Sequence, residues 1–321
     1  MANLLRLIEN TGAYKTVKSD KAANRLSHAY LILSADKDNL GEYLKLFAKL
    51  ILGGDARADR LISEGIHPDV LTFPINGDAV LKEDVAALIE ESFLKPVESD
   101  RKLFIINHGE SMNASSQNKL LKTLEEPPKN VHILIGATSE YPLLTTVKSR
   151  VKKLTVPPFD AETLIDALTD DCPDTERLKE AVSCGDGTVG KALALYGDEN
   201  LSETVELAVD TYNNMLSSRN VLEYSDKITG KNRGIKEFLS VLELINRDNL
   251  LYLSGAEDAV FNKNLLSRIK GAQGFTLGAV IYAAEKIAEA ERRLAANGNP
   301  QAVLERLLFA ILEGKHKWRK L

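Results

Sequence analysis

The sequence predicts an α/β fold followed by helical domains, and three observations support this prediction. Over the first half of the chain, short apolar runs alternate with amphipathic helices. A Pro157-Pro158 pair ends this alternation, and from about Asn200 onward the pattern is helical throughout. Strands that alternate with helices indicate a parallel sheet covered by helices on both faces. We therefore expect a parallel-sheet domain, a small helical domain and a larger C-terminal helical domain.

The expected strands are short and largely apolar, as is typical of strands buried on both faces. Five segments fit this description: Tyr30–Leu33, Val70–Phe73, Leu103–Ile106, His132–Ile135 and Lys152–Val156.

Two amphipathic helices are expected between these strands. One covers Ala79–Lys95, with Asp78 as a plausible N-cap, and the other covers Asn113–Glu125, with Ser111 near its start and two prolines after its end. After Phe159, a small helical unit contains a glycine-rich turn over residues 185–190, which follows no strand and is therefore interpreted as a helix-to-helix connection rather than a phosphate cradle. Longer amphipathic helices follow, at Glu203–Met215, Ile235–Leu253, Leu277–Leu294 and Ala302–Leu312. The basic tail from Lys315 to Lys320 is interpreted as a solvated end.

Composition limits the classes of function. The net charge of −5 argues against a protein that binds nucleic acid on its own through a dominant basic surface. Only Cys172 and Cys184 are present, so neither a disulfide framework nor a cysteine-based zinc site is expected, and no metal site is predicted. The first residues reach charge too early for a signal peptide, and no apolar run is long enough to span a bilayer. The expected location is the cytoplasm.

The loop after the first strand has the position of a nucleotide-binding P-loop but lacks its chemistry. A P-loop reads Gly-x-x-x-x-Gly-Lys-Ser/Thr, in which the lysine reaches the outer phosphates and the hydroxyl holds Mg²⁺. In the segment from Ser34 to Gly41, Leu40 stands at the lysine position and Gly41 at the hydroxyl position. Asp36 and Asp38 add negative charge where a triphosphate would lie. We therefore expect a degenerate P-loop and no bound cofactor.

A set of ordered motifs carries a family resemblance. The most specific is the segment Asn118–Pro128, which ends in Leu-Glu-Glu-Pro-Pro. The others are Arg25–Leu31, His67–Val70, Ala137-Thr138, Leu143–Arg150 and Asn297–Pro300. Together they cover nearly the whole chain and resemble the bacterial clamp-loader subunits of the AAA+ class. The resemblance implies a RecA-like AAA+ domain over residues 1–157, a helical lid domain over 158–199 and a helical collar domain for oligomerisation over 200–321.

Within this class, the chain resembles the delta-prime type of DNA polymerase III, because both nucleotide-handling loops have lost their chemistry. In ATP-hydrolysing relatives the third strand ends in an acidic pair that handles Mg²⁺ and the attacking water. Here Asn107 and His108 follow that strand, and neither supplies a carboxylate. His108 could be imagined as a general base, but no nucleophile or metal site accompanies it in the sequence. An ordinary loop histidine is therefore the better interpretation.

The chain departs from the family in three other places. Many relatives carry four zinc-binding cysteines between the first two strands, whereas residues 53–64 contain none. Val151 replaces the cysteine of the Ser-Arg-Cys motif and is expected to pack in its place. The sensor segment of active ATPases carries an arginine after a glycine turn, but here that position falls on Gly190 or Lys191.

Arg150 is the residue that the resemblance singles out, as an arginine finger that acts in the ATP site of a neighbouring subunit. A guanidinium at the transferring phosphate neutralises charge in the transition state, and a lysine lacks its planar fork. The dipeptide alone favours an ordinary surface arginine before a strand, but the surrounding motif reverses this and favours the finger. Ser149 is expected to orient or cap the turn. Glu125 and Glu126 are interpreted as interface or solvated residues rather than catalytic carboxylates, while Lys119 and Lys122 suit either a solvated face or a phosphate contact.

The resemblance implies a non-hydrolysing subunit that acts as a stator of the clamp loader. Its expected partners are the gamma/tau and delta subunits, with the sliding clamp and primer–template DNA contacted within the complex and no membrane. Two alternatives stay open: an ATP-hydrolysing motor subunit of the gamma/tau type, which needs a lysine at Leu40, and a stand-alone DNA-binding protein.

Overall fold

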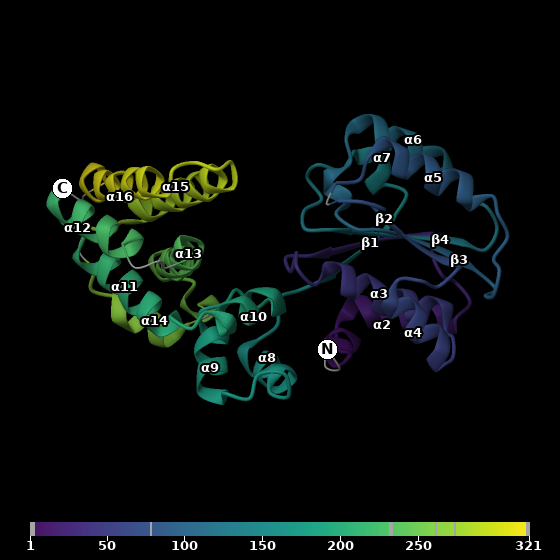
Figure 1. Ribbon diagram of the computed structural model, residues 1–321, viewed down its shortest axis with the longest axis horizontal. Coiled ribbons are helices and arrows are strands. Elements are labelled where there is room, and N and C mark those ends of the chain that lie inside the picture. The colour runs from purple at the N-terminus through teal and green to yellow at the C-terminus, as the bar shows by residue number, and fades with distance from the viewer. Residues whose placement is uncertain (1–3, 78, 231–233, 261, 273, 319–321) are drawn as a thin grey trace. The chain divides into compact units, whose positions relative to one another are not determined.

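The computed structural model describes residues 4–77, 79–230, 234–260, 262–272 and 274–318 of the 321-residue chain (Figure 1). The chain forms two compact units. Unit 1 consists of the chain up to Asp171 together with Thr188–Gly190, and unit 2 consists of Cys172–Gly187 and the chain from Lys191 onward. The division into three domains, with boundaries after residues 157 and 199, stays a prediction.

Unit 1 contains a five-stranded sheet with the strand order β2-β3-β4-β1-β5, and every neighbouring pair is parallel. The strands are β1 (Ala29–Ser34), β2 (Val70–Phe73), β3 (Lys102–Ile106), β4 (Val131–Ala137) and β5 (Lys152–Val156). The prediction of a parallel sheet built from these five segments is confirmed. Because all strands run the same way, the loops that follow β1, β3 and β4 share one edge of the sheet.

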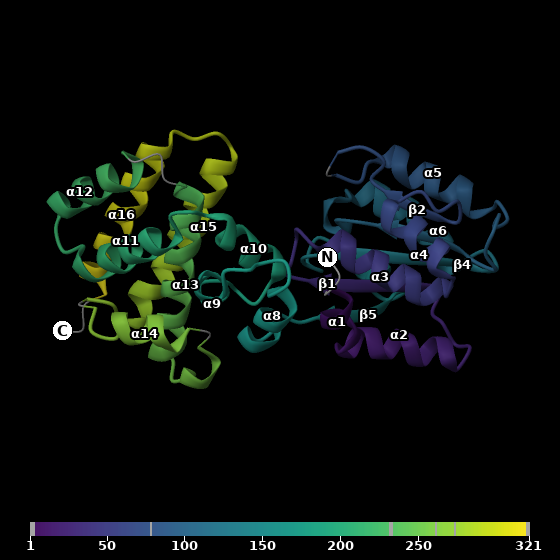
Figure 2. The same ribbon diagram turned by 60° about the horizontal axis from the view of Figure 1, so that its bottom comes forward.

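Helices cover both faces of this sheet, as Figures 1 and 2 show. One face carries α5 (Lys82–Ser92), α6 (Ala114–Glu125) and α7 (Thr145–Lys148), and the other carries α2 (Gly12–Ala22), α3 (Leu40–Leu52) and α4 (Ala56–Glu64). The unit also contains α1 (Leu4–Glu9), the 3₁₀ turn η1 (Gly109–Ser111) and α8 (Ala161–Leu168). Helix α3 approaches β4 closely at Gly136, where a Cβ would lie 2.5 Å from Leu44 Cδ1.

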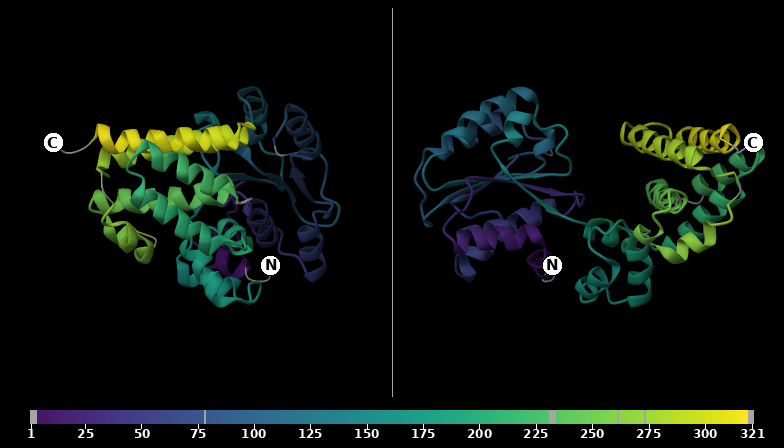
Figure 3. Two further views of the ribbon diagram at one scale, coloured as in Figure 1. Left: turned by 60° about the vertical axis from the view of Figure 1, so that its left-hand side comes forward. Right: turned by 180° about the vertical axis from the view of Figure 1, so that it is seen from behind.

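Unit 2 is helical. Its elements are α9 (Thr175–Ser183), most of α10 (Val189–Gly197), α11 (Leu201–Asn214), α12 (Ser218–Thr229), α13 (Ile235–Leu253), η2 (Glu257–Ala259), α14 (Lys263–Ile269), α15 (Leu277–Ala295) and α16 (Pro300–Lys317). Helices α15 and α16 pack along each other (Figure 3). Tyr212, Phe238, Ile245 and Leu308 lie in the shared core. None of the described helices combines the length and apolar character that crossing a lipid bilayer requires.

The boundaries of two predicted helices were wrong: α5 is shorter than the predicted Ala79–Lys95 at both ends, and α16 is longer than the predicted Ala302–Leu312. Helix α5 begins at Lys82 rather than Ala79, because the Asp84 carboxylate accepts the backbone N–H of Leu81 at 2.8 Å and starts the helix there. The proposed cap Asp78 lies outside the described residues. Helix α16 continues to Lys317, so Lys315 is not part of a solvated tail: it is 3% exposed. Trp318 packs against Tyr282 with ring centroids 5.0 Å apart, whereas Arg319 and Lys320 lie outside the described residues.

Candidate functional site

The positions that correspond to a nucleotide-binding site meet at the edge of the sheet where the strands end. Leu40, at the lysine position, is fully buried under Gly136. Gly41, at the hydroxyl position, lies against Asn107, since a Cβ on Gly41 would be 3.2 Å from Asn107 Nδ2. The two loops predicted to be degenerate are therefore neighbours. An apolar side chain and an amide stand where phosphate and Mg²⁺ chemistry requires a cation and a carboxylate.

The Asp36 carboxylate occupies the centre of this edge. Asp36 is 3% exposed, and its backbone N–H donates to the Ser34 hydroxyl at 3.2 Å. The carboxylate accepts the backbone N–H of Asn39 at 3.2 Å and the Tyr43 hydroxyl at 2.6 Å. Burial and the Asp36 carboxylate raise the pKa of Tyr43, which therefore stays a hydrogen-bond donor. Residues close in the sequence thus satisfy part of the hydrogen-bonding capacity of the Asp36 carboxylate.

The Asn39 side-chain amide also donates to both carboxylate oxygens, at 3.2 and 3.3 Å, and two further donors come from the start of α10. The backbone N–H of Val189 donates to Oδ2 at 3.0 Å, and the N–H of Gly190 lies 3.3 Å from both carboxylate oxygens. Gly190 has no space for a side chain, because a Cβ would lie 2.7 Å from Asp36 Oδ1 and 2.8 Å from Asp38 Cβ. The glycine-rich turn does connect two helices, as expected, and in addition it brings two N–H groups to the degenerate P-loop.

The loop after β3 contains a carboxylate that sequence reasoning overlooked. Glu110 lies two residues beyond His108, and its Oε1 accepts the hydroxyl of Thr138 at 2.7 Å and the Thr138 N–H at 3.2 Å. His108 adopts a left-handed backbone conformation, with φ of 54°, and its Nδ1 lies 3.8 Å from Glu110. This carboxylate therefore links the ends of β3 and β4.

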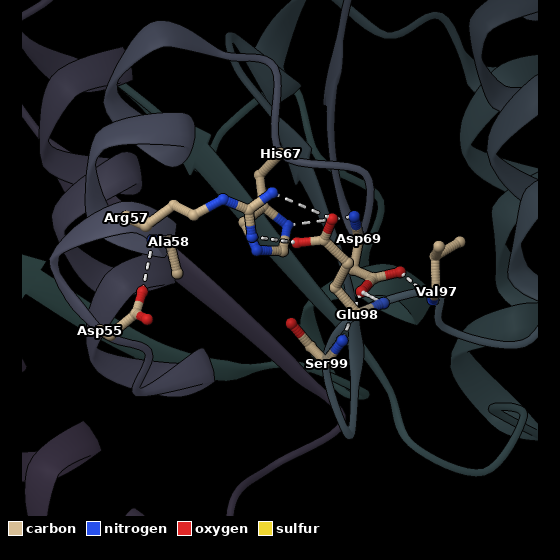
Figure 4. A network of polar contacts seen from close by, with 8 residues as sticks. All are labelled: Asp55, Arg57, Ala58, His67, Asp69, Val97, Glu98 and Ser99. Atoms are coloured by element: carbon tan, nitrogen blue, oxygen red, sulfur yellow. Dashed lines mark hydrogen bonds and ion pairs between the residues drawn. The ribbon is translucent and has the colours of Figure 1, made fainter.

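Residues 53–64, which contain no cysteine, form a turn and a short helix. Gly53 ends α3 with a φ of 65°, and the Asp55 carboxylate caps α4 by accepting the Ala58 N–H at 2.9 Å. Arg57 forms a bidentate pair with Glu98, at 3.0 and 3.3 Å (Figure 4). Within the described residues, no group of three or more His, Cys, Asp or Glu side chains could hold a metal ion.

The same region explains the His67-Pro68-Asp69-Val70 motif. Asp69 is fully buried and accepts the backbone N–H groups of Val97, Glu98 and Ser99 at 2.6 to 2.8 Å (Figure 4). Burial alone would raise the pKa of Asp69, but these three donors outweigh it and lower the pKa. His67 Nδ1 accepts the Asp69 N–H at 3.1 Å. Both residues of this motif therefore fix the loop that precedes β3.

Arg150 lies at the opposite edge of the sheet, between α7 and the start of β5. Its side chain is 35% exposed, and Nη2 forms an ion pair with Glu125 Oε1 at 2.6 Å. Nη1 donates to the Thr146 carbonyl at 3.0 Å and to the Ser149 hydroxyl at 3.1 Å. Ser149 caps α7, and Val151 packs against the core as its apolar character predicts.

Strand direction separates Arg150 from the loop after β1, which was predicted to be a degenerate P-loop. β1 and β5 are parallel neighbours, with Tyr30 opposite Lys152 and Ser34 opposite Val156. Arg150 precedes β5, whereas Asp36 follows β1, so the two residues belong to opposite edges of one sheet. The ion pair between Glu125 and Arg150 was not predicted from the sequence. It joins the end of α6 to the start of β5, two segments that only the folded structure brings together. On α6, Lys119 and Lys122 are exposed.

Comparison with known proteins shows the following similarities. A family model described as DNA polymerase III, delta subunit, matches residues 9–160. The DNA polymerase III subunit delta' of Bacillus subtilis is 29% identical, over 94% of this chain and 94% of its own length. The subunit delta' of Pseudomonas aeruginosa is 29% identical over 48% of this chain and 49% of its own length.

Other similarities extend to related subunits. The subunit tau/gamma of Haemophilus influenzae is 31% identical over 40% of this chain and 20% of its own length. Among solved structures, a DNA polymerase III gamma-subunit-related protein from Thermotoga maritima aligns over 98% of this chain and 99% of its own, with a TM-score of 0.46 and 20% identity.

Proposed function

Because the chain belongs to the delta-prime family of DNA polymerase III clamp-loader subunits, we propose that it is a non-hydrolysing stator that donates Arg150 to a neighbouring ATPase subunit. It would act in DNA replication, during the loading of a sliding clamp on primed DNA. The observation that carries this proposal is the position of Arg150 at the edge of the sheet opposite the degenerate P-loop.

The loss of hydrolysis in this chain is supported at three positions. The buried Leu40 replaces the phosphate-binding lysine, Gly41 replaces the Mg²⁺-binding hydroxyl, and Asn107 replaces the first acidic residue after β3. Glu110 is the nearest carboxylate along the chain, but its Oε1 is engaged by Thr138. We therefore propose that no ATP is turned over at this edge.

The guanidinium of Arg150 suits a role in a neighbouring subunit. It is partly exposed, and it is held by an ion pair with the Glu125 carboxylate and a hydrogen bond to the Thr146 carbonyl. A guanidinium that reaches the transferring phosphate stabilises negative charge in the transition state and contributes about 10³- to 10⁵-fold in rate. Since strand direction keeps Arg150 away from the P-loop of its own chain, a second chain must supply the phosphate.

The proposed partners are the gamma/tau and delta subunits in a hetero-oligomer, with the clamp and primer–template DNA met within the complex, in the cytoplasm. The helices of unit 2 would form the collar that holds the subunits together. In this proposal residues 1–157 form the AAA+ domain, 158–199 the lid and 200–321 the collar.

An Arg150→Ala variant tests the proposal in a clamp loader reconstituted with the tau/gamma and delta subunits. The complex should assemble, and DNA-stimulated ATP hydrolysis at the site that Arg150 serves should fall by about 10³-fold or more. An Arg150→Lys variant should restore only part of this rate, because lysine lacks the bidentate fork. Arg57→Ala is the matched control, since Arg57 is also an exposed, ion-paired arginine of unit 1.

Two results would count against the proposal. Unchanged hydrolysis with Arg150→Ala would remove the finger assignment. Micromolar binding of ATP by the isolated chain would instead favour the alternative of an ATP-hydrolysing motor subunit.

A further inference from the structure

We propose that the Asp36 carboxylate is a built-in substitute for a phosphate group, which occupies the anion position of the degenerate P-loop and binds the start of α10 there. This goes beyond the proposed function, which requires only that ATP is not hydrolysed. The Asp36 carboxylate fills the site, and it holds the start of α10 there.

The donors around Asp36 are of the kind that bind phosphate. Backbone N–H groups at the start of a helix form an anion site, since they point outward and lie at the positive end of the helix dipole. Here the N–H of Asn39, at the start of α3, and those of Val189 and Gly190, at the start of α10, point at one carboxylate. The Tyr43 hydroxyl, at 2.6 Å, and the Asn39 side-chain amide, at 3.2 and 3.3 Å, add two side-chain donors.

Burial and close packing leave no room for another anion beside the Asp36 carboxylate. Asp36 is 3% exposed, Val189 is 1% exposed and Tyr43 is fully buried. Gly190 packs so closely on Asp36 that a Cβ would lie 2.7 Å from Oδ1. A phosphate could therefore reach these N–H groups only by displacing a like-charged group, which both charges oppose.

The carboxylate also joins distant parts of the sequence. Asp36 and Val189 are 153 residues apart, yet Thr188–Gly190 belongs to unit 1. Without the carboxylate, the N–H groups of Val189 and Gly190 would be buried donors that lack their acceptor, which is unfavourable. Asp36 is thus the ligand that keeps the first residues of α10 in unit 1, and no nucleotide is needed.

The test is hydrogen exchange of the isolated full-length chain, with inorganic phosphate as the probe and chloride at matched ionic strength as the reference. In Asp36→Ala, the amides of Val189 and Gly190 should exchange at least about fivefold faster than in the unmodified protein. Saturating phosphate should slow them again by binding in place of the carboxylate. In the unmodified protein, phosphate should have no more effect than chloride.

Asp69→Ala is the matched control, because Asp69 is also a buried carboxylate that accepts three backbone N–H groups. Its substitution should speed exchange at residues 97–99 and leave Val189 and Gly190 unchanged. Asp36→Asn keeps the side-chain size and serves if the alanine variant does not fold: it should show the faster exchange at Val189 and Gly190 to a smaller extent.

The proposal is overturned if the amides of Val189 and Gly190 stay as protected in the Asp36 variants as in the unmodified protein. It is also overturned if phosphate protects these amides in the unmodified protein, since the anion position would then be open. Because this measurement needs neither ATP nor partner subunits, its failure and the failure of the Arg150 proposal are separate outcomes.

Discussion

In each unit of this protein a buried charged side chain meets the end of a helix, and the two charges compared, Asp36 and Lys315, have opposite signs. In unit 1 the Asp36 carboxylate, 3% exposed, accepts N–H groups from the starts of α3 and α10. In unit 2 the Lys315 ammonium, also 3% exposed, donates to the carbonyls of Tyr212 and Met215 at the end of α11, at 2.9 and 3.3 Å. Both arrangements follow the helix dipole, which favours an anion at the amino end and a cation at the carboxyl end.

The difference between them lies in what each charge connects. Asp36 joins two helix starts that are far apart in sequence, whereas Lys315 binds the end of one helix and lies 4.3 Å from the centroid of the Phe275 ring. Burial lowers the pKa of Lys315 to about 8, so the carbonyls and the ring do not fully replace water around the ammonium. Both charges therefore connect segments that are far apart in the sequence, but Asp36 joins the starts of two helices, whereas Lys315 of α16 binds the carboxyl end of one other helix, α11.

The largest effect is expected from Leu40→Lys, which would bury a second charge at the edge of the sheet where Asp36 lies. Leu40, the first residue of α3, is fully buried and lies against Gly136 of β4, so an ammonium there should destabilise unit 1 by about 4 kcal/mol and should not create ATP binding. Leu40→Met, which keeps volume and polarity, should cost less than about 1.5 kcal/mol. Denaturant unfolding and an ATP titration check both. A stable lysine variant that binds ATP would show that the site is open.

The next largest effect is expected at Lys315, as a change of stability with pH. The sign of this change follows from the lowered pKa of Lys315. The ordinary value is 10.5 and the folded value is about 8, so the folded protein binds fewer protons between these pH values and becomes more stable as pH rises. The buried charge destabilises the folded protein by about 3 kcal/mol, and this destabilisation is fully present below pH 8. The unmodified protein should therefore gain stability relative to Lys315→Met between pH 8 and pH 10.5.

Fluorescence of Trp318 measures this, because it is the only tryptophan and packs against Tyr282 in unit 2. Urea unfolding of both proteins at several pH values gives the difference in free energy, from which titrations common to both cancel. A difference that does not change with pH would mean that Lys315 is not held as a buried charge.

Gly190→Ala tests the closeness of the Asp36 contact. The added Cβ would press on Asp36 Oδ1 and on Asp38, so we expect a loss of about 1 to 3 kcal/mol. Gly197, at the other end of the same helix, has open space around it, so Gly197→Ala should be neutral or stabilise by up to about 1 kcal/mol. Thermal denaturation of the two variants compares them directly, and equal effects would argue against a tight contact at Gly190.

The smallest effect is expected at the exposed ion pair between Glu125 and Arg150. It shows how much a pair of charges contributes when it is not buried. Glu125→Gln removes the partner of Arg150, but surface ion pairs contribute only about 0 to 1 kcal/mol. The reconstituted ATPase should therefore change by less than about fivefold. Glu126→Gln, one residue along and also exposed, is the control. A loss as large as that of Arg150→Ala would make Glu125 an essential positioning residue for the arginine.

The sheet could be predicted from sequence because its strands are continuous apolar runs, and the segment from Tyr30 to Leu33 indicates burial on both faces without reference to any other residue. The prediction of a degenerate P-loop rests on Leu40 and Gly41, and the structure places these two residues beside Gly136 and Asn107. It could not show that Asp36 meets Val189, because that contact depends on tertiary packing across 153 residues. Lys315 was misread for a related reason: a basic run at a chain end gives no sign of the carbonyls of α11.

Unit 1 is discontinuous in sequence, and this limits how the protein can be divided. A fragment that stops at Asp171, where unit 1 first ends, omits Thr188–Gly190 and removes two of the hydrogen-bond donors to Asp36. A fragment that continues through α10 to Gly197 retains them. Deletion mapping with the shorter fragment would therefore report the exposure of a carboxylate as well as the loss of unit 2.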